Sequence, residues 1–322
     1  MTFVIRPAEP SDRPEVFRLF SAVFKAEAQP AEWTWKYDEN PSRSTSAIAL
    51  DGERAIGFFG GFATRYRGAS GSLPGTSAVD VMTDPGARRL GSTNLYRNLG
   101  EAFVRYNGER GIPFCFGFPH DRALRIGEKL LGYQTVERAG QWSRELPTPG
   151  LLRRLKRRLL KPGRIERFES AHDVLADAVH ARPGWRTDRS TERLNWRYAR
   201  RPNAGYQLFR VIDPRAREVA YAVVRGVGTR ALLVDLELVD EESGALGDLL
   251  HFIADELRPS ELKTLEIRAS RTSRLATRLS EELSFTPIAS DTCLTFIPVA
   301  PSFDLAEALG RFDYRYGDAD IF

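Results

Sequence analysis

Apolar and polar positions along the first half of the chain change between helical spacing and strand-like runs. Ser11 and Asp12 are residues that N-cap positions prefer, so a helix is predicted to begin near them. The predicted strands cover 2–7, 47–50, 55–67, 77–83, 113–118 and two stretches within 134–146, and the predicted helices cover 11–24, a short segment ending at Tyr37, 92–110 and 121–131. Hairpins combined with β-α crossovers predict an α/β domain with a mixed sheet flanked by helices.

The second half repeats this order and contains a second copy of a short motif. Trp35-Lys36-Tyr37 and Trp196-Arg197-Tyr198 lie 161 residues apart, and each is followed by a strand that ends in an aspartate. The predicted strands are 206–213, 218–226, 230–239, 262–268 and 288–297, with helices over 244–257 and 271–284. This repetition predicts a duplicated chain with a first domain over 1–148 and a second over 165–322, closed by an aromatic, acidic tail.

Length and composition are consistent with two hydrophobic cores. The chain has 322 residues, of which 42% are hydrophobic. No run is long and apolar enough for a membrane span, and the first residues show no signal-peptide pattern, so we expect a cytoplasmic protein. The two cysteines, Cys115 and Cys293, lie in apolar strand-like runs, and the four histidines are scattered. Neither spacing predicts a metal site, so no metal is expected.

A basic stretch separates the two predicted domains. Leucines recur at helical spacing among arginines and lysines between 151 and 167, before Pro162 and Gly163. The pattern predicts a basic linker helix over 149–164. The alternative interpretation is docking of residues 151–167 to an anionic membrane surface or an acidic partner. The net charge of +4 is too small to indicate nucleic-acid binding, which we do not expect.

Residues 77–106 form the segment most informative about chemistry. A β-rich run ends at Thr83, a Pro-Gly turn follows, and the loop containing Arg88, Arg89 and Gly91 leads into an amphipathic helix. The first N–H groups of a helix have no intrahelical partner and carry the positive end of its dipole, which suits a pyrophosphate. Glycine permits close approach of a ligand, and the arginines add charged donors.

At this point the chain resembles the GNAT N-acetyltransferase superfamily in a tandem two-domain form. Arg88-x-x-Gly91-x-Thr93 is similar to the family's coenzyme A loop [QR]-x-x-G-x-[GA], with threonine at the last position, and Leu131-Gly132-Tyr133 resembles the end of the family's fourth helix. The resemblance implies acetyl-CoA as co-substrate and no metal. It implies these cofactor-binding residues: Met82, Thr83, Arg88, Arg89, Leu90, Gly91, Ser92, Thr93 and His120, the last having a helix-capping role as its alternative.

Acyl transfer to an amine needs a base that takes a proton from the acceptor ammonium and an acid that returns one to the leaving thiolate. Asp80 lies on the predicted fourth strand, where the family often carries a carboxylate. Its alternative is a strand-end aspartate that hydrogen-bonds a turn. Glu128 stands where the family commonly has a tyrosine acid, so Glu128 and Tyr96, together with Tyr66, are the remaining catalytic candidates.

The corresponding loop of the second half reads Glu241-Glu242-Ser243-Gly244, whose carboxylates would repel a pyrophosphate. We therefore expect a degenerate copy without coenzyme A. The leading interpretation is an acyl-CoA-dependent N-acyltransferase, an enzyme acting on a small-molecule or peptide amine. The alternatives are a coenzyme A-binding or scaffold protein with impaired catalysis, and a Fem-like aminoacyl transferase of cell-envelope synthesis. The acceptor and the oligomeric state stay open.

Overall fold

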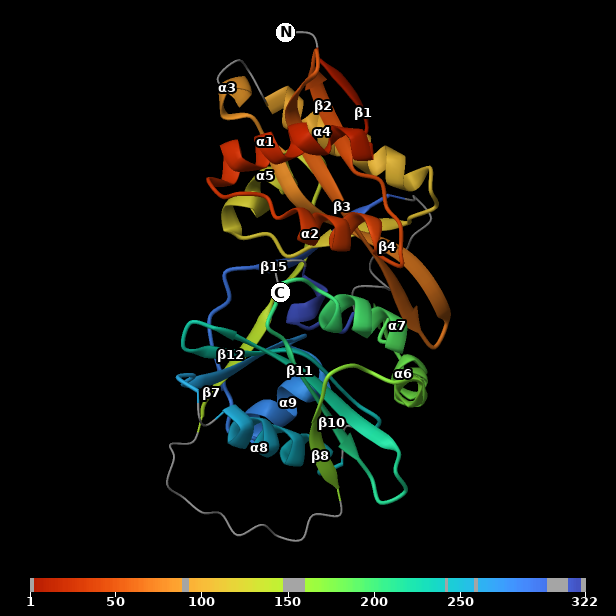
Figure 1. Cartoon of the computed structure of the whole chain (residues 1–322), viewed down its shortest axis with the longest axis vertical. Helices are drawn as coiled ribbons and strands as arrows, with labels where there is room; N and C mark the ends of the chain where they lie inside the picture. Colours follow the sequence, from red (N-terminus) through yellow and green to blue (C-terminus); the bar gives the residue numbers. More distant parts are fainter. Residues whose placement is uncertain are drawn as a thin grey trace. The chain divides into compact units, whose positions relative to one another are not determined.

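The structure is a computed structural model that describes residues 3–88, 93–146, 160–240, 243–257, 260–299 and 312–319. Its contacts divide the chain into two compact units. Unit 1 comprises 1–66, 72–138 and 291–309, and unit 2 comprises 67–71, 139–290 and 310–322. The two units are each built around one mixed sheet (Figure 1).

The sheet of unit 1 has the strand order β1-β2-β3-β4-β5-β15-β6. β4 and β5 pair in parallel, whereas β1–β2, β2–β3, β5–β15 and β15–β6 pair antiparallel. The strands are β1 (Val4–Pro7), β2 (Ala47–Asp51), β3 (Arg54–Gly68), β4 (Gly71–Thr83), β5 (Phe114–Gly117), β6 (Gln134–Arg138) and β15 (Cys293–Pro298). The long hairpin β3–β4 has its tip, 67–71, in unit 2.

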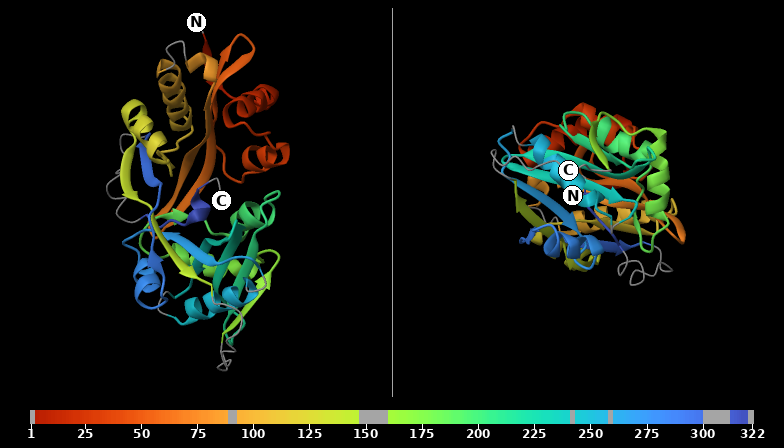
Figure 2. Two further views of the ribbon diagram at one scale, coloured as in Figure 1. Left: turned by 90° about the vertical axis from the view of Figure 1, so that its left-hand side faces the viewer. Right: turned by 90° about the horizontal axis from the view of Figure 1, so that it is seen from below.

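Helices cover both faces of this sheet (Figure 2, left). One face packs Val16, Leu19 and Trp33 against Phe58, and the other packs Leu95, Leu99 and Phe103 against Phe59. The helices are η1 (Pro10–Asp12), α1 (Arg13–Phe24), α2 (Pro30–Trp33), the π-helical turn η2 (Thr34–Asp38), α3 (Pro85–Arg88), α4 (Thr93–Gly108) and α5 (Asp121–Leu131). The two faces of β3 are apolar because it is buried between both layers.

Unit 2 has the sheet order β14-β7-β13-β12-β11-β10-β8. The strands of this sheet are β7 (Gly140–Glu145), β8 (Lys161–Ile165), β10 (Gln207–Ile212), β11 (Glu218–Val227), β12 (Arg230–Leu238), β13 (Thr264–Ala269) and β14 (Thr286–Pro287). The short strand β9 (Arg186–Thr187) is not part of this order and pairs with β3. The helices of unit 2 are η3 (Ser170–His172), α6 (Asp173–His180), α7 (Thr191–Leu194), the π-helical turn η4 (Asn195–Ala199), α8 (Ala245–Leu257), α9 (Arg274–Glu281) and η5 (Tyr316–Asp318). Leu246, Leu249 and Leu250 of α8 pack on one face of the sheet, and Leu175 and Val179 of α6 belong to the other layer.

The two strand orders correspond strand for strand, as the duplication predicts, but each order includes one strand from the other half of the chain. β15 from the second half lies between β5 and β6, and β7 from the first half lies between β13 and β14. Residues 139–148 therefore belong to unit 2 and 291–309 to unit 1. The linear boundaries 1–148 and 165–322 do not describe these units.

The predicted linker helix over 149–164 falls mostly on residues 147–159, which lie outside the described residues. Its last part is corrected by the structure. Lys161–Ile165 form β8, which pairs antiparallel with β10 at the edge of the sheet. Pro162 and Gly163 fit an edge strand. Proline has no N–H to donate to a neighbouring strand, and β8 has a neighbour on one side only.

Candidate functional site

In unit 1 the two parallel strands β4 and β5 separate after a short paired stretch. Thr76 pairs with Cys115 and Ser77 with Phe116, after which β5 ends at Gly117 while β4 continues to Thr83. The backbone of the last residues of β4 therefore extends beyond its parallel partner. The predicted pantetheine-contacting residues Met82 and Thr83 lie at this end of the strand, with both side chains buried.

Asp80 occupies the segment of β4 beyond the last paired residue. Its backbone has a φ of 48°, in the left-handed region where a non-glycine residue is uncommon. Its Oδ2 accepts hydrogen bonds from Lys36 Nζ at 2.9 Å and from the Tyr37 hydroxyl at 2.6 Å. The side chains of Lys36 and Asp80 are 13% and 14% exposed, so this ion pair is only partly accessible to solvent.

The partners of Asp80 come from the first copy of the Trp-[Lys/Arg]-Tyr motif. This motif forms the π-helical turn η2, a rare geometry that is frequent at functional sites. A Cβ on Gly60 would overlap the Tyr37 hydroxyl, so the glycine in β3 makes room for the bond to Asp80. In the sequence the motif indicated only a duplication, and its contact with the candidate base was missed.

Tyr37 also lines a pocket of about 330 Å³ on the α1–α2 side of unit 1. Trp33 and Phe58 contribute apolar surface to it. Its charged lining residues are Glu9, Arg13, Asp38, Arg43 and Arg110. Arg13 and Asp38 form an ion pair at 2.8 Å, so the remaining lining charges, from Arg43, Arg110 and Glu9, are predominantly basic.

The turn after β4 is held by Asp84, which leads the chain toward the predicted coenzyme A loop. Its Oδ1 accepts the Gly86 N–H at 2.7 Å and its Oδ2 pairs with Arg54 at 2.9 Å. Burial raises the pKa of the Asp84 carboxyl, but the hydrogen bonds from Gly86 and Arg54 outweigh it and hold that pKa below its usual value. Residues 89–92 and the side chains of Arg88 and Thr93 lie outside the described residues, so the predicted cradle is not described.

The helix that follows this loop has the apolar face expected from the sequence, because Leu95, Leu99, Ala102 and Phe103 are buried. Tyr96 lies in the core on that side, with its ring 6.1 Å from Phe59. It is hydrogen-bonded to Tyr133, and burial raises the pKa of both phenols. Tyr96 therefore packs against side chains of the core. The described hydrogen-bond partners of Asp80 are two other residues, Lys36 and Tyr37.

The other sequence-predicted residues lie around α5. His120 is the N-cap of α5, where its Nδ1 accepts a hydrogen bond from the Ala123 N–H at 3.4 Å. This is the helix-capping role given above as the alternative to cofactor binding. Glu128 is exposed and accepts a hydrogen bond from Thr135. Tyr66 is buried, and the centre of its ring lies 5.1 Å from the centre of the Phe114 ring. Cys115 and Cys293 are free and buried, and burial raises the pKa of both thiols.

Two negative findings apply to the described part of the chain. Within it, no helix is long and apolar enough to cross a membrane. The same residues include no group of three or more histidine, cysteine or carboxylate side chains arranged to hold a metal ion.

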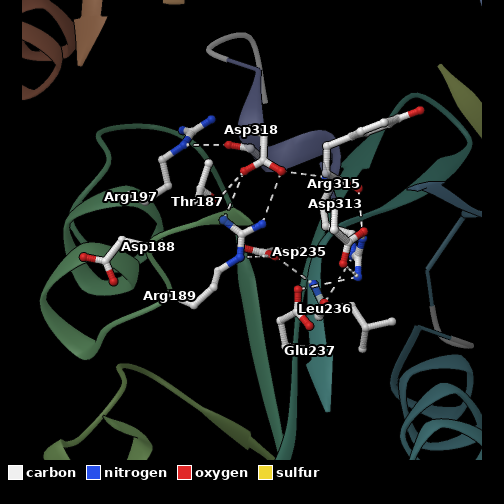
Figure 3. Close-up of polar contacts among 12 residues, drawn as sticks. Thr187, Asp188, Arg189, Arg197, Asp235, Leu236, Glu237, Asp313, Arg315 and Asp318 are labelled. Atoms are coloured by element: carbon white, nitrogen blue, oxygen red, sulfur yellow. Dashed lines mark hydrogen bonds and ion pairs between the residues drawn. The ribbon is translucent and has the colours of Figure 1, made fainter. Parts of the chain in front are cut away.

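Unit 2 repeats the contact between the motif tyrosine and a strand aspartate. The Tyr198 hydroxyl, from the second motif copy in η4, donates to Asp235 Oδ2 at 2.8 Å. Asp235 lies on β12, the strand whose place in its sheet matches that of β4. Unlike Asp80, it is fully buried, and Arg189 Nε lies 3.2 Å from its Oδ1 (Figure 3). The pair therefore belongs to both halves of the duplicated fold.

His180 adjoins this buried cluster as a neutral imidazole. Its Nε2 accepts the backbone N–H of Arg189 at 3.1 Å. Burial lowers the pKa of His180 to about 4. Among its charged neighbours, Asp188 raises that pKa, and Arg67, Arg189 and Arg186 lower it.

We expect unit 2 to lose stability in mild acid because of His180. Between pH 6.5 and 4 the unfolded chain binds a proton on this residue that the folded chain does not, so the contribution is complete above pH 6.5 and is lost as the pH falls toward 4. His180→Gln retains an acceptor for the Arg189 N–H but cannot titrate. Thermal midpoints measured across this window should fall less steeply for the variant, and identical slopes would contradict the assignment.

Comparison with known proteins assigns a family to the first part of the chain. Residues 4–130 match the family model described as an acetyltransferase (GNAT) domain. Among functionally curated proteins, none matches significantly. Residues 4–130 are therefore a GNAT domain, and the resemblance to the GNAT superfamily seen in the sequence is confirmed.

Solved structures extend this likeness over both units. A GCN5-related N-acetyltransferase from Anabaena variabilis ATCC 29413 is 14% identical with a TM-score of 0.68, covering 92% of this chain and 73% of that one. A probable N-acyltransferase from Enterococcus faecalis V583, described as a conserved protein of unknown function, is 12% identical with a TM-score of 0.67, covering 93% and 73%. A tandem GNAT protein from the clavulanic acid biosynthesis pathway, solved without acetyl-CoA, is 14% identical with a TM-score of 0.60, covering 94% and 100%. The chain has the fold of tandem GNAT proteins.

Proposed function

We propose that the chain is an N-acyltransferase that moves an acetyl or related acyl group from coenzyme A to an amine through a site in unit 1. The observation that carries the proposal is Asp80 on β4, next to the point where β4 and β5 separate within a GNAT domain. The GNAT match favours an acyl-CoA donor over the aminoacyl-tRNA used by Fem-type enzymes.

The residues of unit 1 fit a coenzyme A thioester at the level of the backbone. The end of β4 beyond Ser77 has no β5 residue in register with it, which leaves Met82 and Thr83 suited to the pantetheine arm. The start of α4 at Thr93 suits the pyrophosphate. Arg88 and Arg89, whose side chains lie outside the described residues, are its charged donors in the sequence-based prediction. The thioester supplies an activated acyl group, and this chain supplies its position and the handling of the acceptor's proton.

The proposed chemistry requires one base. Both described hydrogen bonds of Asp80 end on Oδ2, so Oδ1 is the oxygen that takes the proton from the acceptor ammonium. The freed amine attacks the thioester carbonyl and forms the C–N bond, the nitrogen releases its second proton to water, and the C–S bond breaks. A thiol has a pKa of roughly 8.5, so the sulfur can leave as a thiolate and take a proton from water. Tyr96 and Glu128 then need not act as the acid, and they stay candidates only.

The pocket lined by Tyr37 supports one class of acceptor over another. Once the Arg13–Asp38 pair is set aside, the arginines Arg43 and Arg110 outnumber the carboxylate of Glu9 among its lining charges. Basic side chains attract an acceptor that carries a carboxylate or another anionic group and disfavour a polyamine. We therefore favour an amine with an apolar body and an anionic group, such as an amino acid or peptide.

A second candidate is a coenzyme A-binding protein without turnover. It is favoured by the ion pair with Lys36, which holds Asp80 in a charged contact, and by the second copy of the tyrosine–aspartate pair in unit 2. Both features suit a structural role for the Asp80 carboxylate.

Acetyl-CoA should stabilise the protein through the 88–93 loop. A ligand that binds only the folded state at a hundredfold excess over Kd adds about 2.7 kcal/mol, which raises the thermal midpoint by several degrees. Arg88→Ala and Gly91→Leu should abolish or reduce this shift, because the first removes a charged donor and the second fills the backbone approach. Differential scanning fluorimetry with and without millimolar acetyl-CoA measures it.

Arg215→Ala is the matched control, since Arg215 is exposed in unit 2. The cofactor assignment would be refuted if acetyl-CoA did not raise the thermal midpoint of the wild type. It would also be refuted if acetyl-CoA raised the midpoints of Arg88→Ala, Gly91→Leu and Arg215→Ala equally. Release of free thiol with an amine panel then separates the enzyme from the binding protein without turnover.

A further inference from the structure

Unit 2 contains the counterpart of the candidate site. β12 and β13 pair in parallel through Leu233 and Ile267, as β4 and β5 do through Ser77 and Phe116. β12 then continues to Leu238 and carries Asp235, the counterpart of Asp80, shortly after the last pair. Unit 2 therefore has the same separation of strands at which unit 1 is proposed to hold the acyl-CoA arm.

In unit 2 this position is filled by residues 312–319, here called the plug segment. Its turn η5 packs against both β12 and β13. The Arg315 Nε donates to the Leu236 carbonyl of β12 at 3.3 Å, and the Arg268 guanidinium of β13 lies 4.6 Å from the centre of the Tyr316 ring. The Tyr314 hydroxyl accepts the N–H of Gly140 in β7 at 3.0 Å. The plug segment thus binds backbone groups at the strand separation itself.

Close packing around Gly317 brings the plug segment onto the tyrosine of the motif. A Cβ at this position would overlap the Tyr198 hydroxyl and lie 3.2 Å from the Val234 carbonyl. Arg197, the neighbour of that tyrosine, donates to the Gly317 and Ala319 carbonyls at 3.2 and 2.7 Å. In unit 1 the corresponding Lys36 instead donates to Asp80. At the middle position of the motif, Arg197 of the second copy therefore binds the plug segment, whereas Lys36 of the first copy binds Asp80.

Buried charges fix the plug segment further (Figure 3). Asp318 accepts two hydrogen bonds from Arg189, at 3.0 and 3.2 Å, and one from the Thr187 hydroxyl at 2.6 Å. Arg189 also pairs with Asp235, the counterpart of the candidate base. Arg189, Asp235 and Asp318 are at most 3% exposed. Removing one partner would leave another charge buried without its counterion, which is strongly destabilising.

We propose that the plug segment is a built-in ligand of unit 2 that takes the place of an acyl-CoA arm, so that the chain has one acyl-CoA position rather than two. Unit 2 then depends on residues 312–319 for stability and does not respond to the cofactor. This inference concerns unit 2 and stands whether or not unit 1 catalyses acyl transfer.

Matched alanine substitutions at two glycines test the plug in the full chain. Gly317→Ala forces the plug segment away from Tyr198, whereas a Cβ at Gly247 of α8 would meet nothing within 4 Å apart from the neighbouring backbone of its own helix. We expect Gly317→Ala to lower the thermal midpoint by about 10 °C and to expose the chain near residue 312 to limited proteolysis. Gly247→Ala should keep the midpoint within about 2 °C of the wild type and retain resistance.

A double variant guards against a simple failure of Gly317→Ala to fold. Tyr198→Phe removes the hydroxyl that the new Cβ would meet, so Tyr198→Phe/Gly317→Ala should regain part of the midpoint and protease resistance lost in the single variant. Equal midpoints and proteolysis for Gly317→Ala and Gly247→Ala would overturn the plug, and so would a double variant as unstable as the sum of its single variants.

Isothermal titration with acetyl-CoA separates this proposal from the function of unit 1. We expect one equivalent per chain for the wild type and for Gly317→Ala. Two equivalents for the wild type, or a second equivalent gained by Gly317→Ala, would overturn the closed second position. No binding at all would refute the proposed function of unit 1, while the midpoints and proteolysis would still decide the role of the plug segment.

Discussion

A fragment of residues 1–148, the first domain expected from the sequence, should not fold. It lacks β15, which lies between β5 and β6 of the unit 1 sheet. Leu294, Phe296 and Ile297 of β15 are buried, and burial of each contributes about 1.5–3 kcal/mol. Their loss, together with the exposure of Phe114 and Phe116, approaches the whole stability of about 5–15 kcal/mol of a typical domain. Far-UV circular dichroism and a thermal scan of the purified fragment measure this.

A second fragment, in which the missing strand is restored, is the control. Arg138 at the end of β6 pairs with Cys293 at the start of β15, and the two strands are antiparallel. Residues 1–138 joined by a short turn to 292–299 should therefore form the strand order β1-β2-β3-β4-β5-β15-β6 and melt cooperatively. Cooperative folding of residues 1–148 without β15, or failure of the joined fragment under the same conditions, would contradict the exchange of strands.

The exchange could not have been predicted from local patterns. Hydrophobic periodicity located the helix over 121–131 and the strand beginning near 230 to within a residue, because each depends on the spacing of its own side chains. The same spacing does not specify which sheet a strand joins. β7 and β15 were each predicted as strands, but both were assigned to their own half, since neighbours in sequence usually pair.

The edge strand β8 was missed for a different reason. The leucines among basic residues before it have helical spacing, and the prediction extended that helix as far as residue 164. In the sequence Pro162 and Gly163 indicate the end of a helix, whereas in the structure both belong to a strand paired on one side only. An edge position tolerates both residues, so local propensity could not distinguish the two outcomes.

The candidate site was predicted only in part. Asp80 was singled out, but its partner Tyr37 lies 43 residues earlier, and their contact depends on the glycine at position 60. A signal was nevertheless present in the sequence. Each copy of the Trp-[Lys/Arg]-Tyr motif precedes a strand aspartate by a similar distance, 43 residues to Asp80 and 37 to Asp235. Comparing the two halves for shared polar residues would have linked the tyrosine to the aspartate.

Replacing Asp80 by asparagine is expected to lower kcat/KM for acyl transfer by about 10²–10⁴-fold at neutral pH, because a positioned general base typically contributes that much. The amide retains the shape of the side chain, and its oxygen can still accept the hydrogen bond that the Tyr37 hydroxyl donates to Asp80 at 2.6 Å. It cannot take a proton from the acceptor ammonium. Acetyl-CoA binding should stay within about threefold of the wild type, because the carboxylate is assigned to the acceptor. Steady-state thiol release and titration with acetyl-CoA measure the two effects separately.

Tyr37→Phe is the matched control, since it removes only the hydroxyl and retains the ring packed 4.8 Å from Trp33. Loss of one hydrogen bond to a charged group corresponds to roughly tenfold in rate, so this variant should lie between the wild type and Asp80→Asn. A structural carboxylate would give the opposite pattern. Asp80→Asn would then lose thermal stability while the folded fraction kept its full rate, which would move the base to another residue and leave the Lys36–Asp80–Tyr37 contact as architecture shared with unit 2.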